Sequence, residues 1–242
     1  MNQRDYFGQR HGYMYYRGGA FSEFILSVIK RLTGRDFEDL DTVYELGAGM
    51  GRFSHAFVNR FRNVYLIEPS HAYADVLREV FPQANSIVRE SSSEQFFEED
   101  RTADGKAACF CFHVLHHLTF DQRRSIFDSI HKLKIEAVFV DPNPLNPLIP
   151  FQVLLHPAMK WAEERGYLKL RRRVLLNELA QAGLSCTQHF YLCFLPPGIA
   201  NFALKLKLAK LLLKIEAFSN LLPFFAAYQM VYCKPEPTFA RP

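Results

Sequence analysis

Residues 43–54, VYELGAGMGRFS, join an apolar run to a helical pattern through three glycines at alternate positions. The β-branched and apolar residues 42–46, which precede the glycines, predict a buried strand. After Gly47, Gly49 and Gly51, apolar residues return at helix spacing. A strand, a glycine turn and a helix in this order bring backbone close to a ligand and direct a helix N-terminus towards it.

An acid ends the second predicted strand, residues 63–67, at Glu68. A carboxylate at this place after the glycine turn can accept hydrogen bonds from both hydroxyls of a ribose. The turn and the acid together therefore predict a site for a nucleoside-type cofactor.

The spacing of the glycines indicates which nucleoside. The dinucleotide fingerprint G-x-G-x-x-G would place its third glycine at position 52, which is Arg52, whereas Gly51 comes one residue early. Glu45 stands two residues before the first glycine. The pattern E-x-G-x-G-x-G resembles the first motif of class I S-adenosylmethionine-dependent methyltransferases, in which the loop wraps the amino-acid end of the cofactor. The resemblance extends over 41–141, with weaker agreement to residue 234.

The composition fits one globular α/β domain of 242 residues, with 49% hydrophobic and 22% charged residues. A net charge of +4 does not favour nucleic acid as a partner. The N-terminus has no signal-peptide pattern, and no run of 18 apolar residues predicts a membrane span. The five cysteines form no C-x-x-C pair, which favours reduced thiols. We expect a cytoplasmic monomer or homodimer.

The resemblance implies a Rossmann-like, doubly wound seven-stranded sheet, mostly parallel with an antiparallel last strand, within a single domain over 1–242. An N-terminal helical lid is expected in 1–34, and the cofactor-binding core in 41–141. Acceptor-side elements are expected in 142–170 and in a helical insert, 196–223, between the last two strands.

The resemblance also implies S-adenosyl-L-methionine as the cofactor and a set of residues that contact it. Ser92 and Ser93 would hold the adenine, although Ser92 also fits a helix cap. A tyrosine or arginine from the N-terminal segment would meet the cofactor carboxylate. The expected cofactor-binding residues are Glu45, Gly47, Ala48, Gly49, Gly51, Glu68, Pro69, Ser92, Ser93, His113 and Tyr16.

Three histidines follow the apolar run 107–112, which predicts a central parallel strand. The segment VLHHL, residues 114–118, resembles the fourth motif of methyltransferases that act on small molecules, quinones and lipids. His113, His116 or His117 could take a proton from a hydroxyl acceptor, or the histidines could only pack and cap the next helix. A metal site from His113, His116 and Asp141 is the third interpretation, and we expect no metal because other ligand-type spacing is absent.

The insert carries lysines and a broad apolar face on what the pattern predicts to be one helix. Residues 198–218 could cover the acceptor cleft, form a dimer contact or lie peripherally on an anionic membrane.

These patterns predict S-adenosylmethionine-dependent methyl transfer to a small hydrophobic, natural-product, quinone-like or lipid-like acceptor, with oxygen favoured as the methylated atom. A nicotinamide-dependent oxidoreductase is disfavoured by Arg52. A non-catalytic scaffold or partner subunit with the same fold is the remaining alternative.

Overall fold

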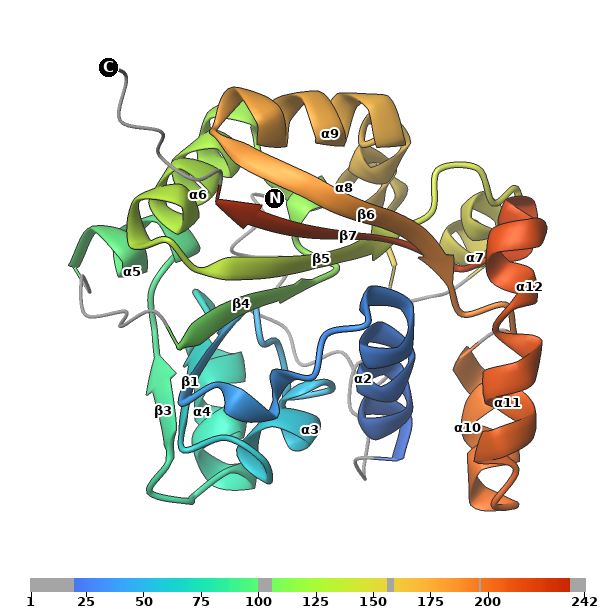
Figure 1. The fold of residues 1–242 in the computed structure, drawn as a ribbon, viewed down its shortest axis with the longest axis horizontal. Helices are drawn as coiled ribbons and strands as arrows, with labels where there is room; N and C mark the ends of the chain where they lie inside the picture. Colours follow the sequence, from blue (N-terminus) through green and yellow to red (C-terminus); the bar gives the residue numbers. More distant parts are fainter. Residues whose placement is uncertain (1–19, 100–105, 156–158, 196, 236–242) are drawn as a thin grey trace.

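The chain folds around one seven-stranded sheet in the order β3-β2-β1-β4-β5-β7-β6 (Figure 1). This computed structural model describes residues 20–99, 106–155, 159–195 and 197–235. The strands are β1 (Thr42–Leu46), β2 (Asn63–Ile67), β3 (Ser86–Arg89), β4 (Ala107–Phe112), β5 (Glu136–Pro142), β6 (Leu184–Leu192) and β7 (Tyr228–Pro235). Only β7 runs against the others, between β5 and β6, which confirms the expected doubly wound sheet with an antiparallel last strand.

Helices cover both faces of the sheet, with α2, α3 and α4 on one face and α5, α6 and α9 on the other (Figure 1). The helices are α2 (Ala20–Thr33), α3 (Ser54–Val58), α4 (His71–Val80), α5 (Ser93–Glu99), α6 (Phe120–Leu133), α7 (Leu148–Leu155), α8 (Trp161–Glu164), α9 (Arg172–Gln181), α10 (Pro197–Lys205), α11 (Ala209–Ile215) and α12 (Phe218–Leu221). Short 3₁₀ turns complete the chain: η2 (Phe37–Asp39), η3 (Leu115–His117), η4 (Arg165–Lys169) and η5 (Pro223–Phe225).

The two covered faces explain why β4, AACFCF, is apolar at every position. Alternate side chains of a strand point to opposite faces of the sheet. Phe110 and Phe112 pack in the cluster beneath α2 and α3, whereas Cys109 and Cys111 pack against α6 and α9. A central strand buried on both faces therefore has no solvent-facing position, as in other parallel sheets.

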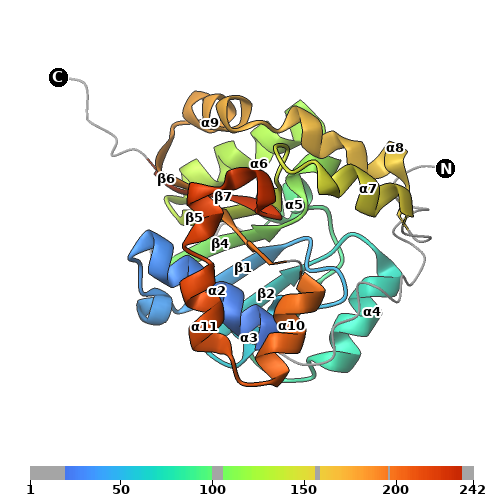
Figure 2. The same ribbon diagram turned by 90° about the vertical axis from the view of Figure 1, so that its right-hand side faces the viewer.

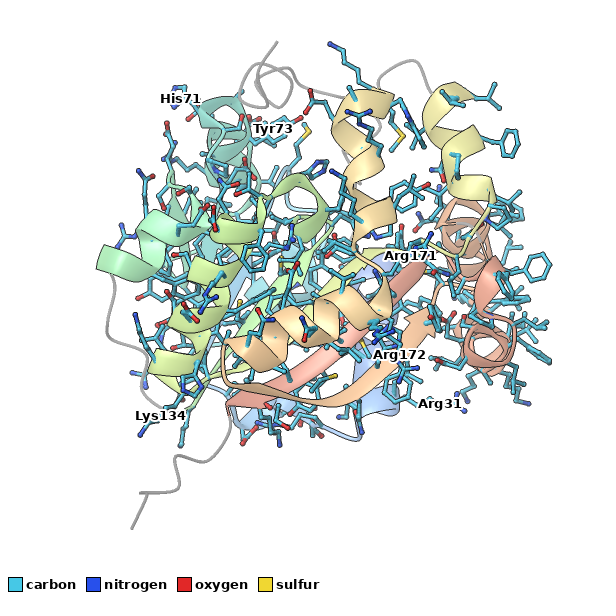
Figure 3. All side chains as sticks on the ribbon, turned by 90° about the horizontal axis from the view of Figure 1, so that it is seen from above. Arg31, His71, Tyr73, Lys134, Arg171 and Arg172 are labelled. Atoms are coloured by element: carbon cyan, nitrogen blue, oxygen red, sulfur yellow. The ribbon has the colours of Figure 1, made fainter. Side chains whose placement is uncertain are left out.

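The insert between β6 and β7 is helical, but it is not the single helix that its pattern predicts. Lys207 has a φ of 60°, and this left-handed residue ends the turn after α10. The chain then reverses, so that α10 and α11 lie side by side (Figure 2). The insert is tied to the domain at Arg31 of α2, labelled in Figure 3, whose guanidinium donates to the Leu213 carbonyl at 2.8 Å.

The topology gathers the site elements at one edge of the sheet. The parallel strands β1, β2, β4 and β5 end at the same edge, and β7 begins there because it is antiparallel to β5. The end of β6 pairs with the start of β7, so the whole insert also emerges at this edge. Open α/β sheets bind their ligands outside the carboxyl ends of the strands.

Candidate functional site

The glycine turn after β1 is a backbone cradle with one open side. Gly47, Gly49 and Gly51 all have left-handed φ angles, of 65°, 58° and 84°. A Cβ at Gly47 would lie 2.3 Å from Val114, and one at Gly51 would lie 2.3 Å from Phe81, so both glycines are required by packing. A Cβ at Gly49 would meet no atom within 4 Å. The backbone at Gly49 is therefore accessible to a ligand from that side.

Glu68 contacts the turn through the backbone N–H of Gly49. Its carboxylate accepts hydrogen bonds from the N–H of Gly49 at 2.8 Å and from the N–H of Ser70 at 2.9 Å. A carboxylate has about four lone-pair positions, so two acceptor positions remain for a ligand. Burial raises the pKa of Glu68 to about 7, although both backbone hydrogen bonds oppose the shift.

Glu45 is the second buried acid of the cradle. It lies in β1, where its carboxylate accepts from the Ser54 hydroxyl at 2.6 Å, and burial raises its pKa to about 8. No basic side chain among the described residues forms an ion pair with Glu45 or Glu68. Two buried carboxyl groups without a cation favour a ligand that brings positive charge, because buried charges need a partner.

The remaining expected cofactor residues lie partly in the glycine turn and after Glu68, and partly at the start of α5. Ala48 lies inside the turn, where its N–H donates to the Ile67 carbonyl at 3.1 Å, and Pro69 directly follows Glu68. Ser92 accepts from the Gln95 N–H at 3.3 Å, which confirms its helix-cap interpretation, and Ser93 begins α5. Tyr16 lies outside the described residues.

Arg52, at the position where a dinucleotide site would have its third glycine, connects the turn to α2. Its guanidinium lies over the rings of Phe21, at 4.8 Å, and Phe53, at 5.2 Å. Phe21 belongs to α2, the described part of the expected N-terminal lid. The arginine therefore holds this helix beside the cradle through cation–π contacts.

His113 is held in an unusual conformation at the end of β4. Its φ is 60°, and its ring packs 4.4 Å from Tyr228 and 5.8 Å from Phe53. A left-handed backbone at a residue other than glycine is uncommon and is concentrated at functional sites. Burial, followed by the charges of Arg52 and its neighbouring histidines, lowers the pKa of His113 well below its ordinary value.

His116 lies between two acids in the buried turn η3. Its Nδ1 is 2.6 Å from Asp141 Oδ1, and its Nε2 is 3.5 Å from Glu164 Oε2. Burial lowers the pKa of His116, but the two carboxylates outweigh burial and raise it to about 9. The ring of His117 is 3.8 Å away, and burial lowers the pKa of His117 to about 3.

Glu164 is a site residue that the sequence did not single out. It lies 47 residues beyond His117, in a segment expected only to form one wall of the acceptor pocket. Glu163 and Glu164 are adjacent acids in a segment, 142–170, that otherwise has no acid, and this is the signal that could have pointed to Glu164. Asp141, by contrast, lies at the end of β5 beside His116, where its position in the sequence predicted it.

The two expected acceptor-side segments are joined by hydrogen bonds. The carboxamide of Asn143 donates to the carbonyl oxygens of Pro223 and Ala226, at 2.7 and 2.9 Å. The Asn146 carboxamide donates to Ala226 as well, at 3.0 Å. The segment that follows β5 and the end of the insert therefore form one continuous surface.

This surface exposes many large apolar side chains. Leu155 of α7 is 82% exposed and Leu221 of α12 is 72% exposed. Of the apolar face predicted for the insert, Leu212 is buried, whereas Ile199, Phe202, Leu208, Leu211 and Phe218 are exposed. Among the helices that the structure describes, none combines the length and apolar character needed to cross a bilayer.

Comparison with known proteins supports the resemblance that the sequence motifs indicated. Residues 44–137 match the family model described as a methyltransferase domain. These residues form a methyltransferase domain, in agreement with the resemblance to class I S-adenosylmethionine-dependent methyltransferases. The match spans β1 to β5 and contains the glycine cradle, Glu68 and the histidine segment, so it covers the elements on which the resemblance rested.

Solved structures share the fold of this methyltransferase. A SAM-dependent methyltransferase from Archaeoglobus fulgidus superposes with a TM-score of 0.61 at 13% identity, covering 88% of this chain and 94% of the other. Magnesium protoporphyrin IX methyltransferase from Synechocystis PCC 6803, with bound SAH, gives 0.58 at 13% identity over 96% and 97%. Mitomycin 7-O-methyltransferase gives 0.57 at 16% identity over 90% and 54%. No curated protein matches the sequence of this chain.

The cofactor of this methyltransferase is S-adenosyl-L-methionine, and the residues of the cradle fit it. Gly49 leaves space against the backbone, Glu68 retains acceptor positions for hydroxyl groups, and the two buried carboxyl groups favour a positively charged ligand. The match to a methyltransferase domain supports methyl transfer over the nicotinamide-dependent and non-catalytic alternatives.

Proposed function

We propose that this methyltransferase transfers the methyl group to an oxygen atom of a small hydrophobic or lipid-like acceptor at a membrane surface. The observation that carries the proposal is the exposed apolar surface of α7, α10, α11, α12 and η5, which emerges at the same edge of the sheet as the cofactor cradle. An apolar surface of this extent on a soluble domain marks an interaction site.

The charge of this surface favours an anionic membrane over other apolar partners. Lys205, Lys207, Lys210 and Lys214 are all exposed and lie among the exposed leucines and phenylalanines of α10 and α11. Apolar side chains flanked by lysines are typical of helices that lie in the interface of anionic bilayers. Each lysine near such a surface contributes about 1 kcal/mol to binding.

The cofactor would be held by the cradle and by Glu68, in the roles that the family pattern implies. Glu68 would accept both ribose hydroxyls, and the backbone around Gly49 with Glu45 would surround the methionine end. Ser92, Ser93 and Pro69 would line the adenine side. When bound, the cofactor supplies a methyl group activated by a positively charged sulfur, so the protein can act largely by aligning the acceptor.

The histidines at the end of β4 would orient the acceptor, and one of them would receive its proton. His113, His116 and His117 follow the strand that ends between the cradle and the acceptor-side segments. Replacement of His116 or His117 by alanine should lower turnover and leave cofactor affinity unchanged. Full turnover in both variants would assign the two rings to packing alone.

The acceptor class is tested with S-adenosylmethionine labelled in its methyl group. The enzyme is incubated separately with a total lipid extract and with an aqueous metabolite extract, and the labelled products are separated. Label in an organic-soluble product that carries a methoxy group supports the proposal. Label confined to the aqueous fraction, or on carbon or nitrogen, would overturn it.

Membrane binding is tested by flotation with vesicles. The enzyme should float with vesicles of phosphatidylcholine and phosphatidylglycerol, and less with phosphatidylcholine alone. The double variant Lys207→Glu with Lys210→Glu should reduce flotation at least tenfold, because reversing each charge turns attraction into repulsion. Equal flotation of both proteins would contradict a charge-assisted contact.

A further inference from the structure

A close contact between backbones brings three potential metal ligands together at the end of β4. The turn η4 packs against η3 at Gly166, where a Cβ would lie 1.9 Å from the His116 carbonyl oxygen. Only glycine allows this approach, and it carries Glu164 of α8 to the pair His116-His117. The contact between η3 and η4 is separate from the cofactor cradle, which is formed by the glycine turn after β1 and by Glu68.

The distance between His116 and Glu164 suits two ligands of one ion better than a hydrogen bond. His116 Nε2 and Glu164 Oε2 are 3.5 Å apart, and Nε2 makes no hydrogen bond although its side chain is only 1% exposed. Two ligands bound to a tetrahedral zinc ion at about 2.0–2.1 Å lie roughly 3.4 Å from each other. A buried nitrogen without a hydrogen bond is uncommon, and a metal ion would satisfy it.

Both histidine rings are oriented as metal ligands are. His116 Nδ1 is 2.6 Å from Asp141 Oδ1, and His117 Nδ1 is 3.2 Å from the Glu163 carbonyl oxygen. Both partners accept a hydrogen bond from Nδ1–H, which leaves Nε2 of each ring as the atom that can bind an ion. At His116 the ion would displace the Nε2 proton, because a histidine ligand must be deprotonated at the atom that binds the metal. Metal-binding histidines usually donate their other nitrogen to a carboxylate or a backbone carbonyl in this way.

We propose that His116, His117 and Glu164 bind a divalent transition-metal ion of the zinc type. One donor atom from each residue lies within 4.8 Å of the other two, so small shifts of the side chains would close the site. Two histidines and one glutamate form a ligand set of catalytic zinc sites, in which a further position stays open. Asp141, which the sequence suggested as a ligand, instead orients His116.

The open position gives the ion a use in the proposed function. A zinc-type ion can bind an oxygen atom and lower the pKa of its hydroxyl group. This use rests on the proposed transfer to oxygen. The ion would bind the acceptor hydroxyl beside the cradle and lower its pKa. Metal binding itself needs neither cofactor nor acceptor, so it can be measured alone.

The test is a titration of the full chain, free of any affinity tag and treated with a chelator, with Co²⁺ followed by visible absorption and with Zn²⁺ followed by calorimetry. The wild-type chain should bind about one equivalent, with the absorption of cobalt bound to nitrogen and oxygen. Glu164→Gln and His117→Ala should each weaken binding at least tenfold. Glu163→Gln, a matched change at the adjacent residue outside the cluster, should bind as the wild type does.

Three results would overturn the proposal: no saturable binding, equal binding by Glu164→Gln, or thiolate absorption that places the ion at a cysteine. The first two would leave a buried ion pair among His116, Asp141 and Glu164. Circular dichroism verifies that each variant is folded. Because S-adenosylmethionine affinity is measured in parallel on the metal-free chain, failure of the metal site is distinguished from failure of the methyltransferase function.

Discussion

Replacing Glu68 with glutamine should weaken S-adenosylmethionine binding about 30-fold to 150-fold. The carboxylate already accepts from the N–H groups of Gly49 and Ser70, at 2.8 and 2.9 Å, and keeps two positions for the ribose hydroxyls. Glutamine keeps the shape of the side chain but has one acceptor oxygen in place of two. Its amide N–H₂ group would therefore face one of these backbone N–H donors and one ribose hydroxyl. Loss of one hydrogen bond to a charged acceptor costs about 2–3 kcal/mol, which gives this change in Kd.

The measurement is calorimetric titration of both proteins with S-adenosylmethionine at pH 8, above the pKa of about 7 that burial gives Glu68. The control is Glu79→Gln, an exposed acid on α4, the helix that begins just after Glu68. Its Kd should equal that of the wild type. If Glu68→Gln binds within threefold of the wild type, or if the control weakens binding as much, the ribose is held by other residues.

Glu45→Gln should flatten the dependence of the unfolding free energy on pH. Burial raises the pKa of Glu45 from 4.5 to about 8. The contribution of Glu45 to folding is therefore complete below pH 4.5 and is lost as the pH rises through about 8. In urea unfolding, the wild type should lose up to about 1.4 kcal/mol per pH unit more than the variant across this window, and parallel curves would refute the assignment. Glu178→Ala should cost about 3–5 kcal/mol, because Arg123, which is bound by both Glu178 oxygens at 2.7 Å, would remain buried without its partner. Asp128→Ala, at an exposed pair, should cost under about 1 kcal/mol. Urea unfolding of both variants measures these losses, and equal losses would contradict the distinction. Gly166→Ala should lower the unfolding free energy by about 3 kcal/mol or more, because the new Cβ would clash with the His116 carbonyl oxygen. A loss of less than about 1 kcal/mol would show that η3 and η4 are not closely packed.

The sheet and the cradle were predictable because they depend on local patterns. Thr42–Leu46, Asn63–Ile67 and Ala107–Phe112 match their predicted bounds, since continuous apolar runs between polar turns leave little choice of register. The contact between Gly49 and Glu68 also follows from local order, because β1 and β2 are parallel neighbours that end together.

The insert and the histidine cluster were not fully predictable. The helical pattern of the insert continues through Lys207, and a left-handed φ at a lysine leaves no mark in the sequence. The approach of Glu164 to His116 depends on packing at Gly166, which joins segments that are far apart along the chain. A glycine within a polar stretch is usually interpreted as a turn, so its role in close packing was not evident.

The carboxamides of Asn143 and Asn146, which donate to backbone carbonyls at the end of the insert, limit how this enzyme can be re-engineered. A chimera that takes only the segment after β5 from a relative would lose the two carboxamide donors, so the carbonyl oxygens of the insert would have no partner. A chimera that takes only the insert would leave the two carboxamides without their acceptors. Substrate range in this scaffold would then change by exchanging both segments as a pair, even though the intervening residues 171–195, which include α9 and β6, could stay as they are.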